Sequence, residues 1–192
     1  MTRSDDWMSA WRPMTEAVGR QFEEGEAAFS ADEIERSAIR RYLEPLEFDC
    51  PLHHDREAAQ AQGYADVLVP TSALPTFALG PMWRPGEVFF TSADRNAQPA
   101  ASVLRWITSP LEPPTTGYFA TNFDVDYLLP AVVGDRLLRR GARLLGCLPK
   151  ETKVGRGAFL TWESEIVNQR REVVARLRTT FYRYNPHSGA RP

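Results

Sequence analysis

Residue types that mark particular protein classes are scarce in this chain of 192 residues. It has only two cysteines, Cys50 and Cys147, and three histidines, and no Cys-x-x-Cys pair occurs. This scarcity argues against a zinc module and against a disulfide framework, and it indicates a reducing compartment. Lysine is rare as well, since only Lys150 and Lys153 stand among 23 basic residues, a bias that we attribute to genome composition.

Long apolar runs and an excess of one charge are also missing. Arg, Pro or Asp interrupts every apolar stretch before the roughly 18 residues that a membrane span needs, and the N-terminus lacks the apolar run of a secretory signal. The 23 basic and 25 acidic residues nearly cancel, with an isoelectric point near 6.0. We therefore expect a cytoplasmic protein with neither a nucleic-acid nor a membrane partner.

The composition supports one hydrophobic core, because 43% of the residues are hydrophobic and 25% are charged. We expect one compact domain over residues 15–185, a flexible N-terminal arm over 1–14 and a C-terminal tail over 186–192. Apolar residues recur in the arm at helical spacing: Trp7, Met8, Trp11 and Met14. We expect this stripe to pack on a neighbouring protein.

Two helices are predicted in the first third of the chain. The motif Ser-Ala-Asp-Glu at 30–33 has the form of a capping box and predicts a helix over 31–43. Asp55 is suited to cap a second helix over 55–62, and Gly63 is suited to end it.

A third, apolar helix and a long connection follow. The segment from Thr71 carries no charge before Arg84, so we expect a helix over 71–79 that is buried almost all round and lies at the centre of the domain. The proline-rich connection over 84–117 is expected to hold a short strand over 87–91 and another over 103–107.

The second half of the chain alternates apolar and polar residues with the period of β-strands. Four strands are predicted, over residues 118–129, 136–148, 158–168 and 172–184. Turn residues separate them, which favours four successive antiparallel strands forming a meander on the buried helix. Helices followed by such a meander define an α+β layout.

Two segments carry a family resemblance. The run FDCPLHHDREAAQAQGYADVLVP, at 48–70, resembles the signature Gly-Asp-x-Asn-Pro-(Leu/Ile)-His-x-Asp of the MaoC-like hydratases and dehydratases of the hot dog fold. The runs PAVVGDRL, at 130–137, and KETKVGRGAFLTWESEIVNQRREVVAR, at 150–176, resemble the strand half of the same fold. The resemblance covers roughly residues 15–185 and is strongest to the N-terminal MaoC-type, or FAS1-like, dehydratase domain.

This resemblance implies a fold and an activity. The fold is a single hot dog domain whose antiparallel sheet wraps around a central apolar helix. The activity is reversible addition of water to a trans-2-enoyl thioester of coenzyme A or acyl carrier protein, as in fatty acid or polyketide metabolism. Neither a metal nor a redox cofactor is implied. The family pairs edge to edge, so we expect a homodimer or a heterodimer with a second MaoC-like subunit.

The family's catalytic histidine aligns with His53, but its catalytic Asp aligns with Phe48. A phenyl ring cannot exchange a proton, so Asp49 or Glu47 would have to act as the acid, which requires a shifted register of the loop. Phe48 is expected to line the substrate pocket. The alternatives are a structural loop histidine and two solvated carboxylates. The family's Asn position is Cys50.

Two further groups are substrate-binding candidates. Backbone amides around Thr71 and Ser72, at the start of the expected central helix, could hold the thioester oxygen, or these residues could simply cap the helix. Lys150, Lys153 and Arg156 could meet coenzyme A phosphates, or could form a solvated turn.

Structural roles are favoured at three other positions. His54 falls on a variable position of the signature, Asp55 is explained by its helix cap, and Gly134-Asp135 by a turn before a strand.

Three functions therefore stay open. The leading hypothesis is a catalytic subunit of an enoyl-thioester hydratase or 3-hydroxyacyl-thioester dehydratase. The second is a non-catalytic, substrate-binding subunit of a heteromeric MaoC-like hydratase, which Phe48 favours. The third is a hot dog acyl-CoA thioesterase.

Overall fold

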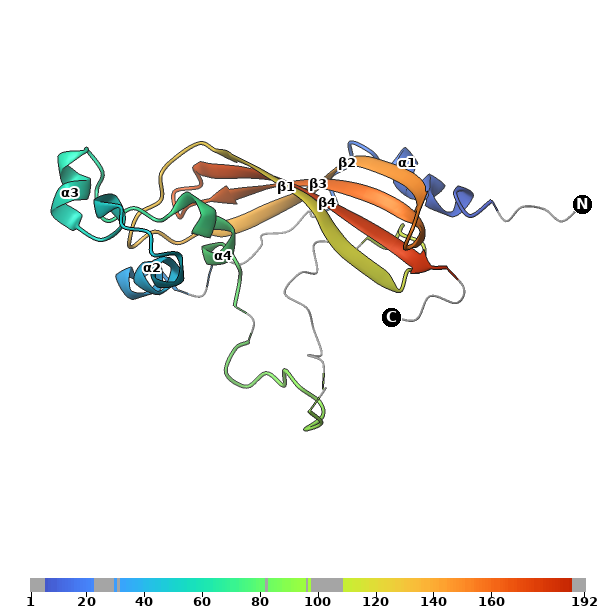
Figure 1. The fold of residues 1–192 in the computed structure, drawn as a ribbon, viewed down its shortest axis with the longest axis horizontal. Coiled ribbons are helices and arrows are strands. Elements are labelled where there is room, and N and C mark those ends of the chain that lie inside the picture. The colour runs from blue at the N-terminus through green and yellow to red at the C-terminus, as the bar shows by residue number, and fades with distance from the viewer. Residues whose placement is uncertain are drawn as a thin grey trace, which may run out of the picture.

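The computed structural model describes residues 6–22, 30, 32–81, 83–95, 97 and 109–187. One antiparallel sheet of four strands forms its centre (Figure 1). The strands are β1 (Gly117–Tyr127), β2 (Leu138–Thr152), β3 (Gly155–Val167) and β4 (Val173–Pro186). All four predicted strands are confirmed.

The strand order is β1-β4-β3-β2, which differs from the predicted meander. Strands β2, β3 and β4 do follow one another, but β1 lies beside β4 and not beside β2. The reason is that the segment between β1 and β2 crosses the end of the sheet, where Val132 bridges to Leu68 and the amide of Leu128 donates to the carbonyl of Val174. Such a crossing has no signal in the alternation of apolar residues.

The β2–β3 connection is tighter than predicted. The expected turn over 149–157 is mostly strand, and only Lys153 and Val154 separate β2 from β3. Two glycines, Gly155 and Gly157, allow the backbone of β3 to approach that of β4 closely here. A Cβ atom at Gly157 would overlap the carbonyl oxygen of Arg183, so a larger residue cannot be accommodated without moving β4.

The inner face of the sheet carries two apolar clusters, one toward each end. In β4, Ala175, Leu177 and Phe181 are buried on this face, while Arg176 and Arg178 lie on the outer face, where Tyr182 is also buried. The first cluster packs the sheet against short helices and includes Ile39, Leu43, Val67, Leu74, Ile166 and Leu177. The second packs it against the N-terminal segment and includes Trp11, Met14, Leu144, Leu160, Trp162 and Phe181.

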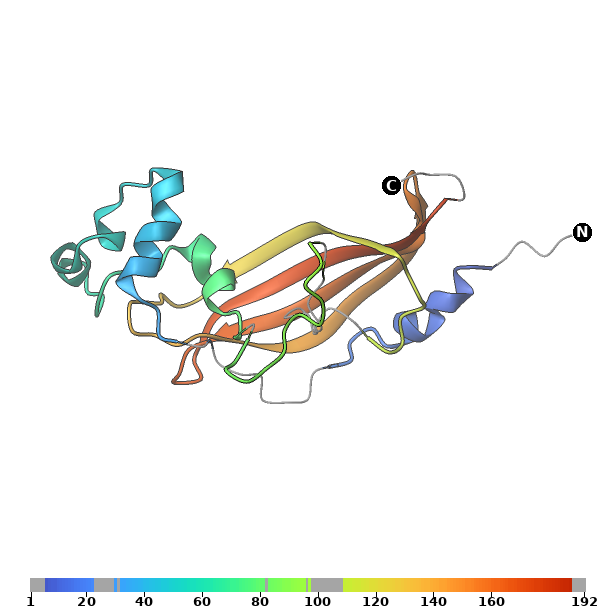
Figure 2. The same ribbon diagram turned by 90° about the horizontal axis from the view of Figure 1, so that it is seen from below.

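Short helices gather at one end of the sheet, as Figure 2 shows. They are α2 (Arg36–Leu43), η2 (Glu44–Leu46), η3 (Pro51–His53), α3 (Arg56–Ala61), η4 (Thr71–Ala73) and α4 (Leu74–Phe77). The Asp55 cap is confirmed, because its carboxylate accepts from the amides of Glu57 and Ala58. The capping box at 30–33 is wrong: the Ser30 hydroxyl donates to the Asp32 carbonyl, and the helix begins only at Arg36.

The apolar helix exists but is shorter than the predicted 71–79. A single 3-10 turn, η4, leads into a single α-helical turn, α4, which ends at Phe77. Ala73, Leu74 and Ala78 are buried against the first cluster, whereas Ser72 and Thr76 are exposed. The helix therefore buries one side and not its whole circumference.

The N-terminal segment folds onto its own sheet. It forms η1 (Ser9–Trp11) and α1 (Arg12–Glu16), and Trp11 and Met14 are buried in the second cluster. Backbone hydrogen bonds also join residues 19–22 to β2 at Leu144 and Ala142. The expected contact of this stripe with a neighbouring protein is thus wrong for Trp11 and Met14, because the sheet of the same chain covers them.

The strand predicted over 87–91 is also wrong. The amide of Glu87 donates to the carbonyl of Arg84, and the Glu87 carboxylate accepts from the Arg84 amide, so this segment is a local turn. The strand predicted over 103–107 lies outside the described residues. In the part of the chain that the structure describes, no helix is long and apolar enough to cross a membrane.

Candidate functional site

The histidine of the signature lies in the short turn η3. Pro51 starts this turn, and the amide of His53 donates to the carbonyl of Cys50 at 3.0 Å to close it. The amide of Leu68 donates to the carbonyl of Leu52 at 2.9 Å, which fastens the turn to the extended piece around Leu68. The position of His53 is therefore set by backbone contacts on both sides of its turn.

The ring of His53 is held in one tautomer. Its Nδ1 atom lies 2.9 Å from the carbonyl oxygen of Leu68. A carbonyl only accepts hydrogen bonds, so Nδ1 carries the hydrogen and Nε2 of the neutral ring keeps a lone pair. A general base needs this state, so His53 is able to accept a proton through Nε2.

No acid accompanies His53 within this chain's described residues. The ring of Phe48 lies against it, with centroids 5.6 Å apart, and Phe48 is 50% exposed. Glu47 and Asp49 are both exposed, and neither carboxylate forms a hydrogen bond or ion pair with His53 in the described part of the chain. Glu47 has a left-handed backbone, with φ of 48°, because it ends the turn η2.

His54 holds the same loop together. Its Nε2 atom lies 3.0 Å from the carbonyl oxygen of Phe48, and the guanidinium of Arg36 donates to the carbonyl of His54. These bonds give His54 the structural role that its place in the sequence indicates.

Thr71 and Ser72 begin η4, three and four residues beyond Leu68, so chain connectivity keeps them within about 11 and 14 Å of that residue. The hydroxyl of Tyr42 donates to the hydroxyl of Ser72 at 3.1 Å, and no side chain caps the turn. The proposed contact of these amides with a thioester oxygen stays a prediction.

The three cations lie at the opposite end of the sheet from His53. Lys150, Lys153 and Arg156 flank the β2–β3 turn, and Arg156 pairs with Glu151 at 3.3 Å. Strand β3 has 13 residues and so separates the two ends by about 40 Å. Figure 1 shows α3, next to the His53 turn, at one end and α1 near the other. A single chain therefore does not bring these cations to His53.

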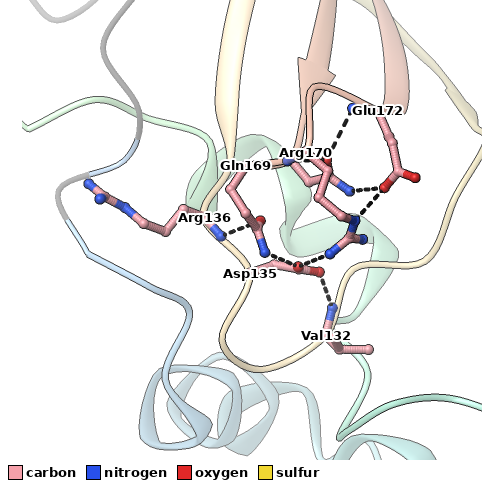
Figure 3. A network of polar contacts seen from close by, with 7 residues as sticks. Val132, Asp135, Arg136, Gln169, Arg170 and Glu172 are labelled. Carbon is pink, nitrogen blue, oxygen red and sulfur yellow. Dashed lines mark hydrogen bonds and ion pairs between the residues drawn. The ribbon is translucent and has the colours of Figure 1, made fainter.

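A buried carboxylate organises the segment that crosses the end of the sheet (Figure 3). Asp135 is 3% exposed, and its oxygens accept from the amide of Val132 and from Nε2 of Gln169, each at 2.9 Å. The guanidinium of Arg170 lies 3.7 Å away. Gly134 supplies the left-handed backbone, with φ of 88°, that this turn requires.

The facing turn between β3 and β4 carries its own polar contacts. Asn168 and Arg170 donate to one carboxylate oxygen of Glu172, at 2.8 and 2.7 Å. These two hydrogen bonds, that from Asn168 first, lower the pKa of Glu172, and the bond to Glu172 raises the pKa of Arg170. In the sequence, the polar run NQRRE after a buried strand is the signal that marks this turn.

The Asp135 network positions His53 indirectly. Asp135 holds the amide of Val132, and Val132 forms the bridge to Leu68, whose carbonyl binds His53. Asp135 is therefore a positioning residue for the histidine turn, a role beyond the strand-entry turn that its sequence position predicts.

The sheet, its short helices and the histidine turn together define an α+β hot dog domain of the hydratase and dehydratase type. The family described as "FAS1-like, dehydratase domain region" matches residues 16–177, and the chain belongs to this family, which places it among the MaoC-like proteins. The predicted family and fold class are confirmed.

Three known proteins illustrate the similarity. A probable enoyl-CoA hydratase alpha subunit from Thermomonospora curvata is 28% identical over 170 residues, which cover 88% of this chain and 50% of that protein. This chain thus spans about half the length of that relative.

Two solved structures share the fold. The ChsH1-ChsH2 complex from Mycobacterium tuberculosis has a TM-score of 0.64 at 19% identity, covering 95% of this chain and 98% of the matched chain. The HadBC 3R-hydroxyacyl-ACP dehydratase complex from the same organism has a TM-score of 0.54 at 12% identity, covering 86% and 96%.

Proposed function

We propose that this chain is one subunit of a heteromeric MaoC-type enzyme that adds water reversibly to a trans-2-enoyl thioester of coenzyme A or acyl carrier protein. In this assembly the partner subunit carries the acid and base, and this chain forms part of the acyl pocket. The observation that carries the proposal is the contact of Phe48 with His53 while Asp49 and Glu47 lie exposed.

The chemistry explains why this observation matters. Hydration needs a base for water and an acid that protonates the α-carbon of the thioester. Phe48 stands where the family signature has its acid, and a phenyl ring transfers no proton. The names of the similar proteins support a divided assembly, because one is an alpha subunit and two are complexes of two named chains.

An open sheet edge is available for such a partner. Residues 19–22 already form hydrogen bonds with part of the outer edge of β2. No described segment pairs with the outer edge of β1, and that strand and the residues after it expose large apolar side chains: Tyr118, Phe119, Phe123, Tyr127, Leu128 and Leu129. The unpaired backbone groups of such an edge can form hydrogen bonds with a strand of another chain, so we propose that the partner binds there.

A second candidate role is specifically favoured by one contact. The bond from His53 Nδ1 to Leu68 leaves Nε2 ready to accept a proton. His53 would then act as base in the assembled enzyme, with the acid from the partner or, less directly, from Asp49 or Glu47. In either role Lys150, Lys153 and Arg156 lie too far from His53 to serve it within one chain, so we assign them to substrate bound elsewhere in the assembly.

The experiment compares the purified chain alone with the chain co-purified with a MaoC-like protein encoded beside it. Hydration of an enoyl-CoA is followed by loss of the enoyl absorbance, and release of free coenzyme A thiol reports the thioesterase alternative. We expect no hydration by the chain alone and hydration by the complex. Hydration by the isolated chain at the rate of the complex would overturn the proposal.

Substitution of His53 then separates the two roles. In the complex, His53→Ala is expected to leave the rate within about twofold if this chain only forms the pocket. A fall of about 10² or more would show that His53 is the base. His54→Ala is the matched control, because it removes the adjacent imidazole, which bonds only the loop backbone.

A further inference from the structure

Three residues form one row across the inner face of the sheet. Phe123 of β1 pairs with Thr179 of β4, and Thr179 pairs with Trp162 of β3. Directly paired residues of antiparallel strands point to the same face, and neighbouring strands lie about 4.8 Å apart. The row therefore spans about 10 Å from the edge strand inward.

Two members of this row have buried polar atoms with no partner. Trp162 is 2% exposed and Thr179 is 4% exposed. The indole Nε1 of Trp162 and the hydroxyl of Thr179 make no hydrogen bond within the described structure. A buried donor or hydroxyl without a partner costs about 1–3 kcal/mol, so two such atoms in adjacent positions point to a group that completes them.

The row lies between the two apolar clusters. Trp162 belongs to the second cluster, and Leu177, two residues before Thr179, belongs to the first. The third member of the row, Phe123, lies on the edge strand and is 48% exposed in the free chain. A ligand lying on Phe123 is thus one strand away from the Thr179 hydroxyl and two from the Trp162 indole.

The chemistry of the row selects its ligand. An indole N–H can only donate, and a threonine hydroxyl both donates and accepts, so an uncharged oxygen, a ketone or a hydroxyl, suits each of them. The surrounding Phe123 ring and apolar clusters match a hydrocarbon body. A charged group is disfavoured here, because no ionic partner belongs to the row and burial of a lone charge is costly.

We propose that Thr179 and Trp162 bind an oxygen substituent on the acyl group of the substrate, remote from the thioester, so that this chain selects oxygenated acyl chains. This inference rests on the proposed function, because it takes the ligand to be an acyl thioester. Ala175 belongs to the first cluster, which adjoins the His53 turn through Val67 and Val69, and it precedes Thr179 by four residues along β4, or about 13 Å. With the thioester at the His53 turn, as in the second candidate role, the oxygen lies toward the far end of a medium or long acyl chain.

The first experiment measures binding and does not need catalysis. Dissociation constants are determined by calorimetry, for the chain and its complex, with lauroyl and palmitoyl coenzyme A and with the ω-hydroxylated form of each. We expect one ω-hydroxylated ligand to bind about tenfold more tightly than its plain counterpart, the scale of one well-placed buried hydrogen bond. Thr179→Val should remove this preference and leave the affinity for the plain ligand unchanged.

Thr180→Val is the matched control. It also removes a threonine hydroxyl from β4, but on the outer face, where the Thr180 hydroxyl bonds that of Thr161 at 2.9 Å. This variant should keep the preference for the oxygenated ligand. Equal binding of plain and oxygenated ligands by the wild-type protein, or equal effects of the two valine variants, would overturn the proposal, as would the absence of any acyl-CoA binding.

Two other occupants of the row would be recognised by their own results. Our proposal expects Thr179→Val to leave the free protein equally or more stable. If a buried water instead forms hydrogen bonds with the two atoms, Thr179→Val should destabilise the free protein as Thr180→Val does, and this result would overturn the proposal. If the partner subunit supplies the oxygen, Thr179→Val should weaken association of the complex and leave ligand preference intact, which also overturns it. If the complex hydrates plain enoyl-CoA but shows no preference for ω-hydroxylated ligands, the proposed function is supported and this inference is overturned.

Discussion

The Nδ1 atom of His53 and the carbonyl oxygen of Leu68 lie 2.9 Å apart, and this contact joins the signature turn to the residue that bridges to Val132 at the end of the sheet. It gives His53 a structural task that is independent of any catalytic one. Substitutions at this position therefore need to preserve one nitrogen while removing the other.

His53→Asn and His53→Ala make that separation. Asparagine places an amide N–H close to the position of Nδ1, so His53→Asn is expected to stay within about 0.5 kcal/mol of the wild-type free energy of unfolding. His53→Ala should lose about 1 kcal/mol, the net value of one hydrogen bond. Urea unfolding measures both, and equal losses in the two variants would show that the Leu68 contact contributes nothing.

The Asp135 network should be far more sensitive. Asp135→Asn keeps one acceptor oxygen but turns an NH2 group toward one of the two existing donors, the amide of Val132 or Nε2 of Gln169. We expect a loss of about 2–3 kcal/mol in unfolding free energy, since a buried group loses its partners. Asp126→Asn is the control, because its exposed pair with Arg178 should contribute less than about 1 kcal/mol. Similar losses at both positions would contradict this account.

The buried pair of Glu112 and Arg183 predicts a pH dependence. Their side chains are 8% and 12% exposed, with Oε2 and Nε 3.3 Å apart. Burial raises the pKa of Glu112 above its ordinary value of 4.5, although Arg183 and the amide of Ser109 oppose this shift. The folded state thus holds its proton to a higher pH than the unfolded state does.

The contribution of Glu112 to the free energy of unfolding should therefore be complete below about pH 4.5. It should fall as the pH rises through the folded-state pKa. Glu112→Gln remains neutral throughout. The difference in unfolding free energy, wild type minus Glu112→Gln, should become less favourable to the wild type between about pH 4 and about pH 8. Glu151→Gln, which changes an exposed carboxylate, is the control, and a difference that rises with pH would refute the assignment.

The open edge of β1 predicts where the partner binds. Tyr127→Lys places a charge among the exposed apolar residues of this edge and should weaken association with the partner by at least about tenfold in sedimentation. Leu148→Lys makes a comparable change at an exposed position of β2, the opposite edge strand, and should leave association unchanged. Both substitutions lie on the surface, so unfolding free energies should change little. Weakening by Leu148→Lys alone would move the interface to β2.

Local patterns in the sequence were sufficient for several elements. Alternating apolar residues identified all four strands, since a half-buried strand needs a period of two. Asp55 and Gly63 marked α3, because a capping carboxylate and a left-handed glycine act within a few residues. The capping box predicted at 30–33 was wrong, because the Ser30 hydroxyl bonds the Asp32 carbonyl and the helix begins only at Arg36.

Elements that depend on distant neighbours were not predictable in this way. The strand over 87–91 is absent because no described strand pairs with that segment and Arg84 and Glu87 bond each other. The N-terminal stripe was predicted to pack on a neighbouring protein, but in the folded chain β2 and β3 of the same sheet bury Trp11 and Met14.

The sequence by itself determined the class of fold, because alternating apolar residues mark the strands, and the family resemblance aligns His53 with that family's histidine and Phe48 with its acid. Only the tertiary structure decided that β1 lies beside β4, that the Lys150 cluster stands a full strand length from His53, and that Asp135 supports the Leu68 bridge. It also brought Phe123, Thr179 and Trp162 into one row. These relationships join residues far apart in the chain, and strand pairing, which periodicity does not encode, is what sets them.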